Sequence, residues 1–191
     1  MDALPRITAV TGHGKGKTTS AMGRAVLAAA AGERVLVVQF LKGTGYTGEL
    51  TAAPYWQGRL EIRQFGGGCP HSAEIAQGVG LCRRCGTCFR TNRRPENDFA
   101  GQAFRCAQHA AASGDWDLLV LDEISHPLNK GLLAASPVVE WLRQTAANVR
   151  LVLTGRDMPA MVLALADEAT ECAAVKHPMS RGILGRWGVE Y

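Results

Sequence analysis

Residues 12–19 read Gly-His-Gly-Lys-Gly-Lys-Thr-Thr and stand between an apolar run at 7–10 and a stretch with the composition of a helix. Glycines allow a tight turn whose backbone N–H groups point at an anion, and the N-terminus of the following helix adds positive potential. Lys17 supplies a full charge, and the hydroxyl of Thr18 is placed to bind Mg²⁺. A strand, a glycine-rich turn, Gly-Lys-Thr and a helix in this order predict a phosphate-binding loop rather than a turn with incidental lysines.

The loop departs from the usual spacing by one residue. Four residues ordinarily separate the first glycine from the Gly-Lys-Thr triplet, whereas three separate Gly12 from Gly16. We therefore expect a tighter loop, on which the phosphates need not lie as they do in an ordinary ATPase.

Length and composition indicate one globular domain. A chain of 191 residues can bury a core of its own, and a net charge of +4 suits a small polyanion without requiring nucleic acid. No apolar run approaches the roughly 18 residues of a membrane span, and the N-terminus lacks the features of a secretory signal. We expect a cytoplasmic protein, with no membrane partner, whose six cysteines are thiols or metal ligands rather than disulfides.

Strand-like and helix-like segments alternate along the chain. Strands are predicted at 6–10, 35–40, 60–65, 117–122, 148–153 and 169–175, and helices at 17–31, 97–113 (with Asn97 as a cap), 137–147 and 158–166. This alternation predicts an α/β fold of the P-loop NTPase-like type, with a mostly parallel sheet, right-handed crossovers and helices on both faces. In such sheets ligands bind beyond the carboxyl ends of the strands.

Two carboxylates, Asp122 and Glu123, end a buried strand. Near a phosphate-binding loop the first can hold Mg²⁺, and the second can order water or act as a base. The alternative is a solvated strand end. Arg156 follows the next strand and is expected to reach the ligand, the alternative being a surface arginine.

A cysteine-rich insertion occupies about 67–97. Cys82, Cys85 and Cys88 are separated by two residues each, and Cys69 is the natural fourth ligand. Positive charge nearby depresses thiol pKa values, and arginines stand at positions 83, 84, 90, 93 and 94. Two short gaps in series favour an iron–sulfur cluster of the [4Fe–4S] type, with Zn²⁺ as the alternative and no metal as the third interpretation. Cys106 and Cys172 are expected to be small buried hydrophobic residues.

Several short blocks occur in one order, at 12–19, 37–43, 47–49, 121–123, 154–156, 175–178 and 188–191. In this set the chain resembles the ATP:corrinoid adenosyltransferases, from Ile7 to Tyr191 with an interruption at about 67–97. That family's loop is also one residue short, and its ATP lies in the reverse sense, which exposes the 5′ carbon. The resemblance implies transfer of the 5′-deoxyadenosyl group of ATP to the cobalt(I) of a corrinoid, with release of tripolyphosphate, in adenosylcobalamin biosynthesis or salvage.

The resemblance also implies roles for individual residues. Mg²⁺ would be held by Thr18, Asp122 and Glu123. The catalytic residues would be Lys17, Thr18 and Glu123. The corrinoid would lie near Lys176 and His177. It implies a homodimer and an electron donor such as a flavodoxin or a reductase. The expected ATP ligands are Gly12, His13, Gly14, Lys15, Gly16, Lys17, Thr18, Thr19, Arg24 and Arg156.

Two departures from the family pattern stand out. Leu27 replaces an arginine of the loop helix, and we expect Arg24, one turn earlier, to take its place. The segment 66–70 replaces aromatic residues that help to displace the lower axial ligand of cobalt. We therefore expect the cysteine-rich insertion to lie beside the corrinoid, where it would shape the pocket or relay an electron.

Three other functions fit parts of the sequence. A nucleoside triphosphatase or kinase with a redox-sensing metal module would release ADP in place of tripolyphosphate. A nucleic-acid-binding protein would use the arginine-rich cysteine segment as a zinc module. An inactive nucleotide binder would use the metal as a structural staple, although Lys17, Thr18, Asp122 and Glu123 argue against it.

Overall fold

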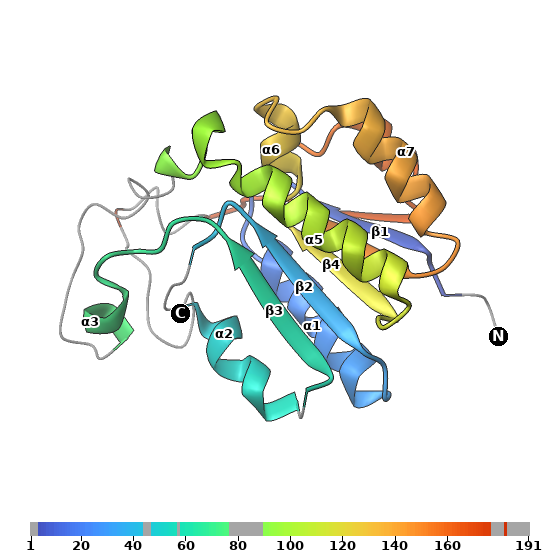
Figure 1. Ribbon diagram of the computed structural model, residues 1–191, viewed down its shortest axis with the longest axis horizontal. Coiled ribbons are helices and arrows are strands. Elements are labelled where there is room, and N and C mark those ends of the chain that lie inside the picture. The colour runs from blue at the N-terminus through green and yellow to red at the C-terminus, as the bar shows by residue number, and fades with distance from the viewer. Residues whose placement is uncertain (1–3, 44–46, 57, 77–89, 177–181, 183–191) are drawn as a thin grey trace.

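The computed structural model describes residues 4–43, 47–56, 58–76, 90–176 and 182 (Figure 1). It contains a six-stranded sheet in the order β3-β2-β4-β5-β1-β6, in which every pair of neighbours is parallel. The predicted α/β fold with a parallel sheet is confirmed. The strands are β1 (Ile7–Thr11), β2 (Val35–Phe40), β3 (Leu60–Phe65), β4 (Leu118–Asp122), β5 (Arg150–Thr154) and β6 (Glu168–Glu171).

Helices cover both faces of this sheet (Figure 1). α1 and α2 lie on one side, and α5, α6 and α7 lie on the other. Across the described residues, no helix combines the length and apolar character that a membrane span requires. The helices are α1 (Lys17–Ala30), α2 (Gly48–Ala52), α3 (Ser72–Ala76), α5 (Phe99–Ser113), α6 (Ser125–Asn129), α7 (Ala135–Thr145) and α8 (Ala160–Leu163), with short 3₁₀ helices η1 (Ala53–Trp56) and η2 (Pro95–Asn97).

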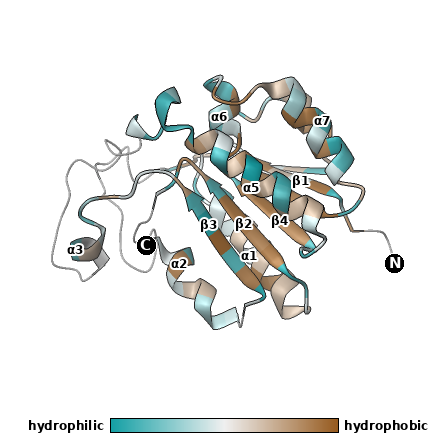
Figure 2. Cartoon of the chain, viewed as in Figure 1, coloured by the Kyte–Doolittle hydropathy of each residue, from teal (hydrophilic) through white to brown (hydrophobic). Residues whose placement is uncertain are grey.

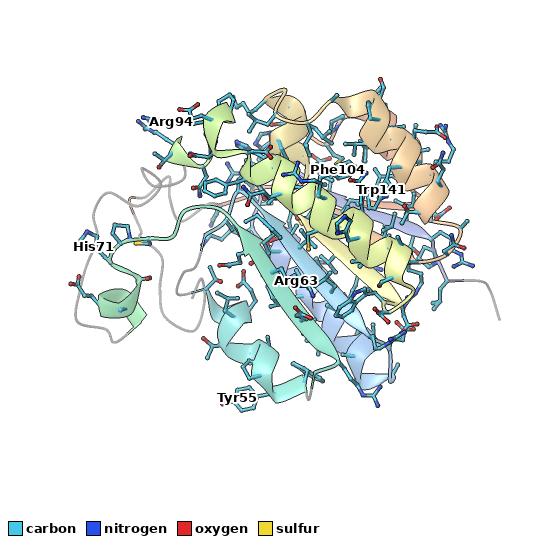
Figure 3. All side chains as sticks on the ribbon, viewed as in Figure 1. Tyr55, Arg63, His71, Arg94, Phe104 and Trp141 are labelled. Carbon is cyan, nitrogen blue, oxygen red and sulfur yellow. The ribbon has the colours of Figure 1, made fainter. Side chains whose placement is uncertain are left out.

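The central strands are buried on both faces and mostly apolar, and Figure 2 shows β2 and β4 largely in brown. Because successive strand residues point to opposite faces, Val35 and Val37 share a cluster with the alanines of α1, whereas Leu36 and Val38 share a cluster with the alanines of α5. On the second face Phe104 of α5 meets the edge of Trp141 of α7, with ring centroids 5.0 Å apart (Figure 3). Two apolar layers therefore hold the sheet in place and leave its carboxyl edge for polar residues.

Several predicted boundaries differ from the structure. The last strand ends at Glu171, so Cys172 lies just beyond it and is half-buried rather than part of the strand core. All four residues of β6 are exposed, because this strand forms an edge of the sheet. Asn97 does not cap α5: it closes the 3₁₀ helix that begins at Pro95, and Asp98 stands at the helix start with φ +45°.

Candidate active site

The phosphate-binding loop lies at the carboxyl edge of the sheet, between β1 and α1, and faces a cavity of about 1080 Å³. We call this the loop cavity. Ligand pockets in proteins usually enclose about 300–1,000 Å³, so it has room for a nucleotide. It is lined by Gly14, Lys15, Gly16, Lys17, Thr18, Thr19, Met22, Gly23, Val26, Lys42, Thr47, Gly48, Glu49, Ala52, Glu123 and Arg156.

The short loop is packed tightly against the segment that follows β6. The backbone N–H of Gly14 donates to the carbonyl of Cys172 over 2.6 Å, and the N–H of Cys172 donates to the carbonyl of Thr11. A Cβ atom on Gly12 or Gly14 would lie 2.5 Å from a carbonyl oxygen of this segment. Because the Gly14 N–H is already used, binding of a phosphate falls to the residues after it, which run into the N-terminus of α1.

Lys17 is buried at the base of the loop cavity. Its Nζ atom donates to the carbonyl of Gly14 over 2.7 Å, inside the loop itself. Burial lowers the pKa of Lys17, and Glu123 partly offsets this effect. The ammonium group therefore has little solvation to lose when an anion enters the loop.

Asp122 is fully buried and accepts hydrogen bonds from four side chains. Its Oδ1 atom accepts from Thr18 (3.0 Å) and Thr154 (2.6 Å). Its Oδ2 atom accepts from Gln39 (2.9 Å) and Lys42 (2.6 Å). Burial works against the charged carboxylate, but Lys42 and the hydroxyl donors outweigh it, and the pKa of Asp122 is lowered. All four acceptor positions are in use, so Asp122 positions Thr18 and Lys42.

Glu123 lines the loop cavity, whereas Asp122 does not. Its backbone adopts φ +66°, which is uncommon for a residue other than glycine, and its N–H donates to Thr154 Oγ1 over 2.9 Å. Burial and the neighbouring Asp122 raise the pKa of Glu123. Because of this left-handed turn, the two consecutive carboxylates lie in different places. Asp122 belongs to the buried hydrogen-bond network, and Glu123 lines the loop cavity.

The oxygen groups at this place fit Mg²⁺. The Thr18 hydroxyl donates its proton to Asp122, which leaves its lone pairs available, and Thr18 and Glu123 both line the loop cavity. Hydroxyl and carboxylate oxygens are ligands that Mg²⁺ prefers. The predicted set Thr18, Asp122 and Glu123 is thus brought together, with Asp122 behind the other two.

Lys42 is a site residue that was not among the predicted ligands. Its Nζ atom lies 2.6 Å from Asp122 Oδ2 and 3.7 Å from Glu49 Oε1. Burial disfavours the charged form of Lys42, but the attraction of Asp122 and Glu49 is larger, and its pKa is raised. Its position just after a buried strand was the signal that could have identified it, because such strand ends carry ligand-binding residues.

A second, smaller cavity of about 250 Å³ shares Lys42 and Glu123 with the loop cavity. We call it the side cavity. Phe40 and Leu41, at the end of β2, form its apolar part. Its remaining lining residues are Arg93 and His126, the latter on α6. Lys42 and Glu123 therefore stand at the boundary between two chambers.

The other predicted ligands of ATP are placed differently. Arg156 lines the loop cavity. Its backbone carbonyl accepts a hydrogen bond from Ser125 Oγ over 2.5 Å. His13 pairs with Asp157, and Arg24 pairs with Glu168 at 3.5 Å. Neither His13 nor Arg24 is among the residues that line the loop cavity, and neither is Leu27, whose side chain is 71% exposed.

The cysteine-rich insertion is described at its two ends. Cys82, Cys85, Cys88 and the corrinoid candidate His177 lie outside the described residues, whereas Cys69 is half-buried and Lys176 is exposed. Among the residues that are described, no group of three or more His, Cys, Asp or Glu side chains is placed to hold a metal ion.

Asn92 fastens both ends of this insertion to β2. Its Oδ1 atom accepts from the Gly67 N–H over 2.7 Å, and its Nδ2 atom donates to the carbonyl of Leu41 over 2.9 Å. Gly43 and Gly67 approach so closely that a Cβ on Gly43 would lie 2.0 Å from the Gly67 carbonyl oxygen. The insertion therefore begins and ends beside Lys42, at the boundary of the two cavities.

A family model and several known proteins that are similar to this chain point to the same family. The family model described as "ATP:corrinoid adenosyltransferase BtuR/CobO/CobP" matches residues 4–191. The corrinoid adenosyltransferase of Escherichia coli is 31% identical over 186 residues, which cover 97% of this chain and 85% of that protein. Corrinoid adenosyltransferase CobA of Salmonella typhimurium is also 31% identical, over 97% of this chain and 85% of that protein. The corrinoid adenosyltransferase of Pseudomonas aeruginosa is 32% identical over 182 residues, or 95% of this chain and 81% of that protein. This chain belongs to the ATP:corrinoid adenosyltransferase family.

Proposed function

We propose that this protein transfers the 5′-deoxyadenosyl group of ATP to the cobalt(I) of a corrinoid and releases tripolyphosphate, in adenosylcobalamin biosynthesis or salvage. Family membership supports this activity. The structural observation that carries it is the pair of cavities that share Lys42 and Glu123. The loop cavity has room for a nucleotide, and Lys42 and Glu123, which also line the side cavity, mark the place where a second substrate would meet it.

The reaction is a nucleophilic displacement at carbon. The electron pair of cobalt(I) forms the Co–C bond at the 5′ carbon, and the C–O bond breaks with its pair going to the α-phosphate oxygen. No protein nucleophile or base is required, so the side chains have to orient the carbon and neutralise the leaving triphosphate. Lys17, Lys42 and Arg156 supply the positive charge, since all three line the loop cavity.

Mg²⁺ would be held by Thr18 and Glu123, with Asp122 behind them. When bound, the ion would neutralise part of the charge on the triphosphate. The hydroxyl of Thr18 is fixed by Asp122, and the same carboxylate holds the Lys42 ammonium, so one buried group orients two contacts to the phosphates.

We further propose that Cys69, Cys82, Cys85 and Cys88 hold an iron–sulfur cluster, or Zn²⁺ as the alternative, near the corrinoid. Their spacing supports a cluster, and the attachment of the insertion beside Lys42 supports the location. The variant Cys85→Ser distinguishes electron relay by the cluster from a structural role of the cluster. Full activity of this variant with pre-reduced cobalt(I) would support electron relay from a donor such as a flavodoxin or reductase. Loss of activity with pre-reduced cobalt(I) would support a structural role, and zinc in anaerobically prepared protein would exclude the relay.

The test of the main proposal is an anaerobic incubation with ATP, Mg²⁺ and chemically reduced cobalt(I) corrinoid, with both products measured. Adenosylcorrinoid and intact tripolyphosphate in equal amounts are expected. ADP and phosphate with unchanged corrinoid would instead indicate the triphosphatase or kinase. Sedimentation of the same preparation tests the homodimer that the family resemblance implies.

A further inference from the structure

We propose that Asn92 positions Lys42 for the transfer reaction, by holding the backbone turn at Leu41 that directs the lysine side chain into the active site. This inference rests on the proposed function, because that function places Lys42 against the leaving triphosphate. Asn92 lies near the end of the cysteine-rich insertion and lines neither cavity, so its effect on the reaction would be exerted through Lys42. The attached ends of the insertion and the active-site lysine would then form one structural unit.

The backbone turn at Leu41 follows directly after strand β2. Leu41 has φ +56°, in the left-handed region that residues other than glycine rarely adopt, and its side chain is buried. A residue keeps such a conformation only where the surrounding structure holds it, and residues of this kind cluster at functional sites. The conformation of Leu41 therefore indicates that neighbouring groups hold this turn and that the turn has a function.

The turn changes the side of the sheet on which Lys42 lies. Side chains alternate between the two faces of an extended chain, so Gln39 and Lys42, three residues apart, would point to opposite faces. In the structure both side chains donate to the same atom, Oδ2 of Asp122, over 2.9 Å and 2.6 Å. The left-handed residue between them therefore brings Lys42 to the side of Gln39, where it pairs with Asp122 and lines the loop cavity.

Asn92 holds this turn through its side-chain amide. Asn92 is 2% exposed, and its Nδ2 atom donates over 2.9 Å to the carbonyl of Leu41, which belongs to the peptide group that joins Leu41 to Lys42. Its Oδ1 atom accepts from the N–H of Gly67 over 2.7 Å, and its Nδ2 atom also lies 3.3 Å from the Gly67 carbonyl oxygen. One buried amide therefore connects the peptide group before Lys42 to the chain that follows β3.

Gly66 brings the chain after β3 into contact with the same turn. Strands β2 and β3 run side by side and end in register at Phe40 and Phe65 (Figure 1). A Cβ on Gly66 would lie 2.7 Å from the carbonyl carbon of Lys42 and 2.8 Å from Asn92 Nδ2. The two chains are therefore packed backbone against backbone beside Lys42, and the amide of Asn92 supplies the hydrogen bonds that fix their spacing.

The experiment is a double-mutant cycle between Asn92 and Lys42, in which calorimetry measures the affinity for ATP in the presence of Mg²⁺. Asn92→Asp keeps the size of the side chain but replaces the donor to Leu41 by an oxygen, and Asn92→Ser shortens the side chain without adding a charge. With Lys42 present, each variant should lower the affinity for ATP by about tenfold, as for a weakened hydrogen bond to a charged group. In the Lys42→Met protein each should change it by less than about twofold, because a positioning residue has no effect once the residue that it positions is absent.

Asn97→Asp is the matched control. Asn97 belongs to the same segment and donates to a backbone carbonyl, that of Thr91, over 2.8 Å, but it lines neither cavity. This variant should keep the affinity for ATP within about twofold of the unaltered protein. Circular dichroism and urea unfolding establish that each protein is folded. Turnover of pre-reduced cobalt(I) corrinoid should fall by about tenfold or more in Asn92→Asp and Asn92→Ser, because the ammonium group is displaced from the leaving triphosphate.

The binding measurements separate this inference from the proposed function. Equal losses of ATP affinity with and without the Lys42 side chain would show that Asn92 acts on the fold in general, and would overturn the inference. Unchanged ATP affinity in folded Asn92→Asp and Asn92→Ser proteins would overturn it as well. Because ATP binding is measured without a corrinoid, failure of the unaltered protein to adenosylate a corrinoid would count against the proposed function alone.

Discussion

Lys42 and Asp122 form a buried ion pair at the boundary of the two cavities, with 2.6 Å between Nζ and Oδ2. The pair joins the end of β2 to the end of β4, two strands that are neighbours in the sheet. Thr18 donates to the other oxygen of the same carboxylate. One buried carboxylate therefore sets the positions of a cation and of a magnesium ligand that come from different parts of the chain.

Replacement of Lys42 should affect both turnover and folding. Lys42→Met removes a charge that faces the leaving triphosphate, and we expect kcat to fall by about 10²–10³. It also leaves Asp122 buried without its cation, which should lower the free energy of unfolding by about 3–5 kcal/mol. Single-turnover adenosylation and urea unfolding measure the two effects. Lys130→Met, at an exposed position, should change neither. Retention of full kcat in a folded Lys42→Met protein would remove Lys42 from the catalytic site.

The dependence on Mg²⁺ should change with the hydroxyl of Thr18. Thr18→Ala removes the group that Asp122 positions, and we expect the Mg²⁺ concentration for half-maximal activity to rise by about tenfold or more. Thr18→Ser keeps the hydroxyl and should stay close to the unaltered protein. Removal of the metal with a chelator should abolish activity in all three proteins. The assignment fails if the alanine and serine variants respond to Mg²⁺ alike.

The stability of the protein should depend on pH through Glu123. The pKa of Glu123 is raised in the folded state. Ionisation of Glu123 therefore lowers the free energy of unfolding as pH rises through this raised pKa, and the penalty is absent at low pH. Glu123→Gln should therefore raise stability at pH 7–8 by about 0.5–2 kcal/mol, or about 2–4 °C in Tm per kcal/mol. This gain in stability should vanish below about pH 4, where the glutamate of the unaltered protein is protonated and therefore neutral like the glutamine.

Asp122 acts in the opposite direction, because its lowered pKa gives stability that is present at neutral pH and is lost on acidification. Thermal unfolding of the unaltered protein and of Glu123→Gln, from pH 4 to pH 8, measures the difference in stability that Glu123→Gln makes at each pH. Glu96→Gln, at an exposed position, is the control. A gain from Glu123→Gln that is the same at pH 4 and at pH 8 would contradict a charge effect.

The tightness of the phosphate-binding loop can be tested at Gly12. Its φ is +97°, and a Cβ would lie 2.5 Å from the carbonyl oxygen of Cys172, so Gly12→Ala should cost about 2–5 kcal/mol and weaken ATP binding. Gly23→Ala lies within α1, where a Cβ meets nothing within 4 Å, and it should gain about 0.5–1 kcal/mol. Chemical denaturation and ATP titration report both effects. Equal stability of the two variants would show that the loop relaxes.

Asn92 should control the attachment of the cysteine-rich insertion. Asn92→Ala removes its bonds to Gly67 and Leu41 and leaves the buried carbonyl of Leu41 unpaired, at a cost of about 1–3 kcal/mol. Asn97→Ala removes an exposed bond to Thr91 and should cost less than about 1 kcal/mol. Denaturation measures both costs, and activity with pre-reduced cobalt(I) shows whether the attachment matters for the site. An unchanged free energy of unfolding in Asn92→Ala would refute the attachment.

Much of the architecture could be predicted from local sequence. The apolar runs at 35–40 and 118–122 predicted buried parallel strands because strands covered on both faces have no polar side. The limits of weaker elements could not be predicted in the same way. Strand β6 is polar and exposed, and its end is set by pairing with β1 rather than by its own residues. The start of α5 is set by Pro95 and the 3₁₀ helix that follows it, not by Asn97.

The sequence alone determined the phosphate-binding loop and the edge of the sheet on which it lies, because glycine conformations, helix starts and apolar strands depend on neighbouring residues. Only the tertiary structure decided which side chains meet there. Lys42 and Asp122 are 80 residues apart in the chain, and Gly14 meets Cys172 across the sheet edge. Such contacts follow from the strand order β3-β2-β4-β5-β1-β6, which long-range packing fixes and no local pattern encodes.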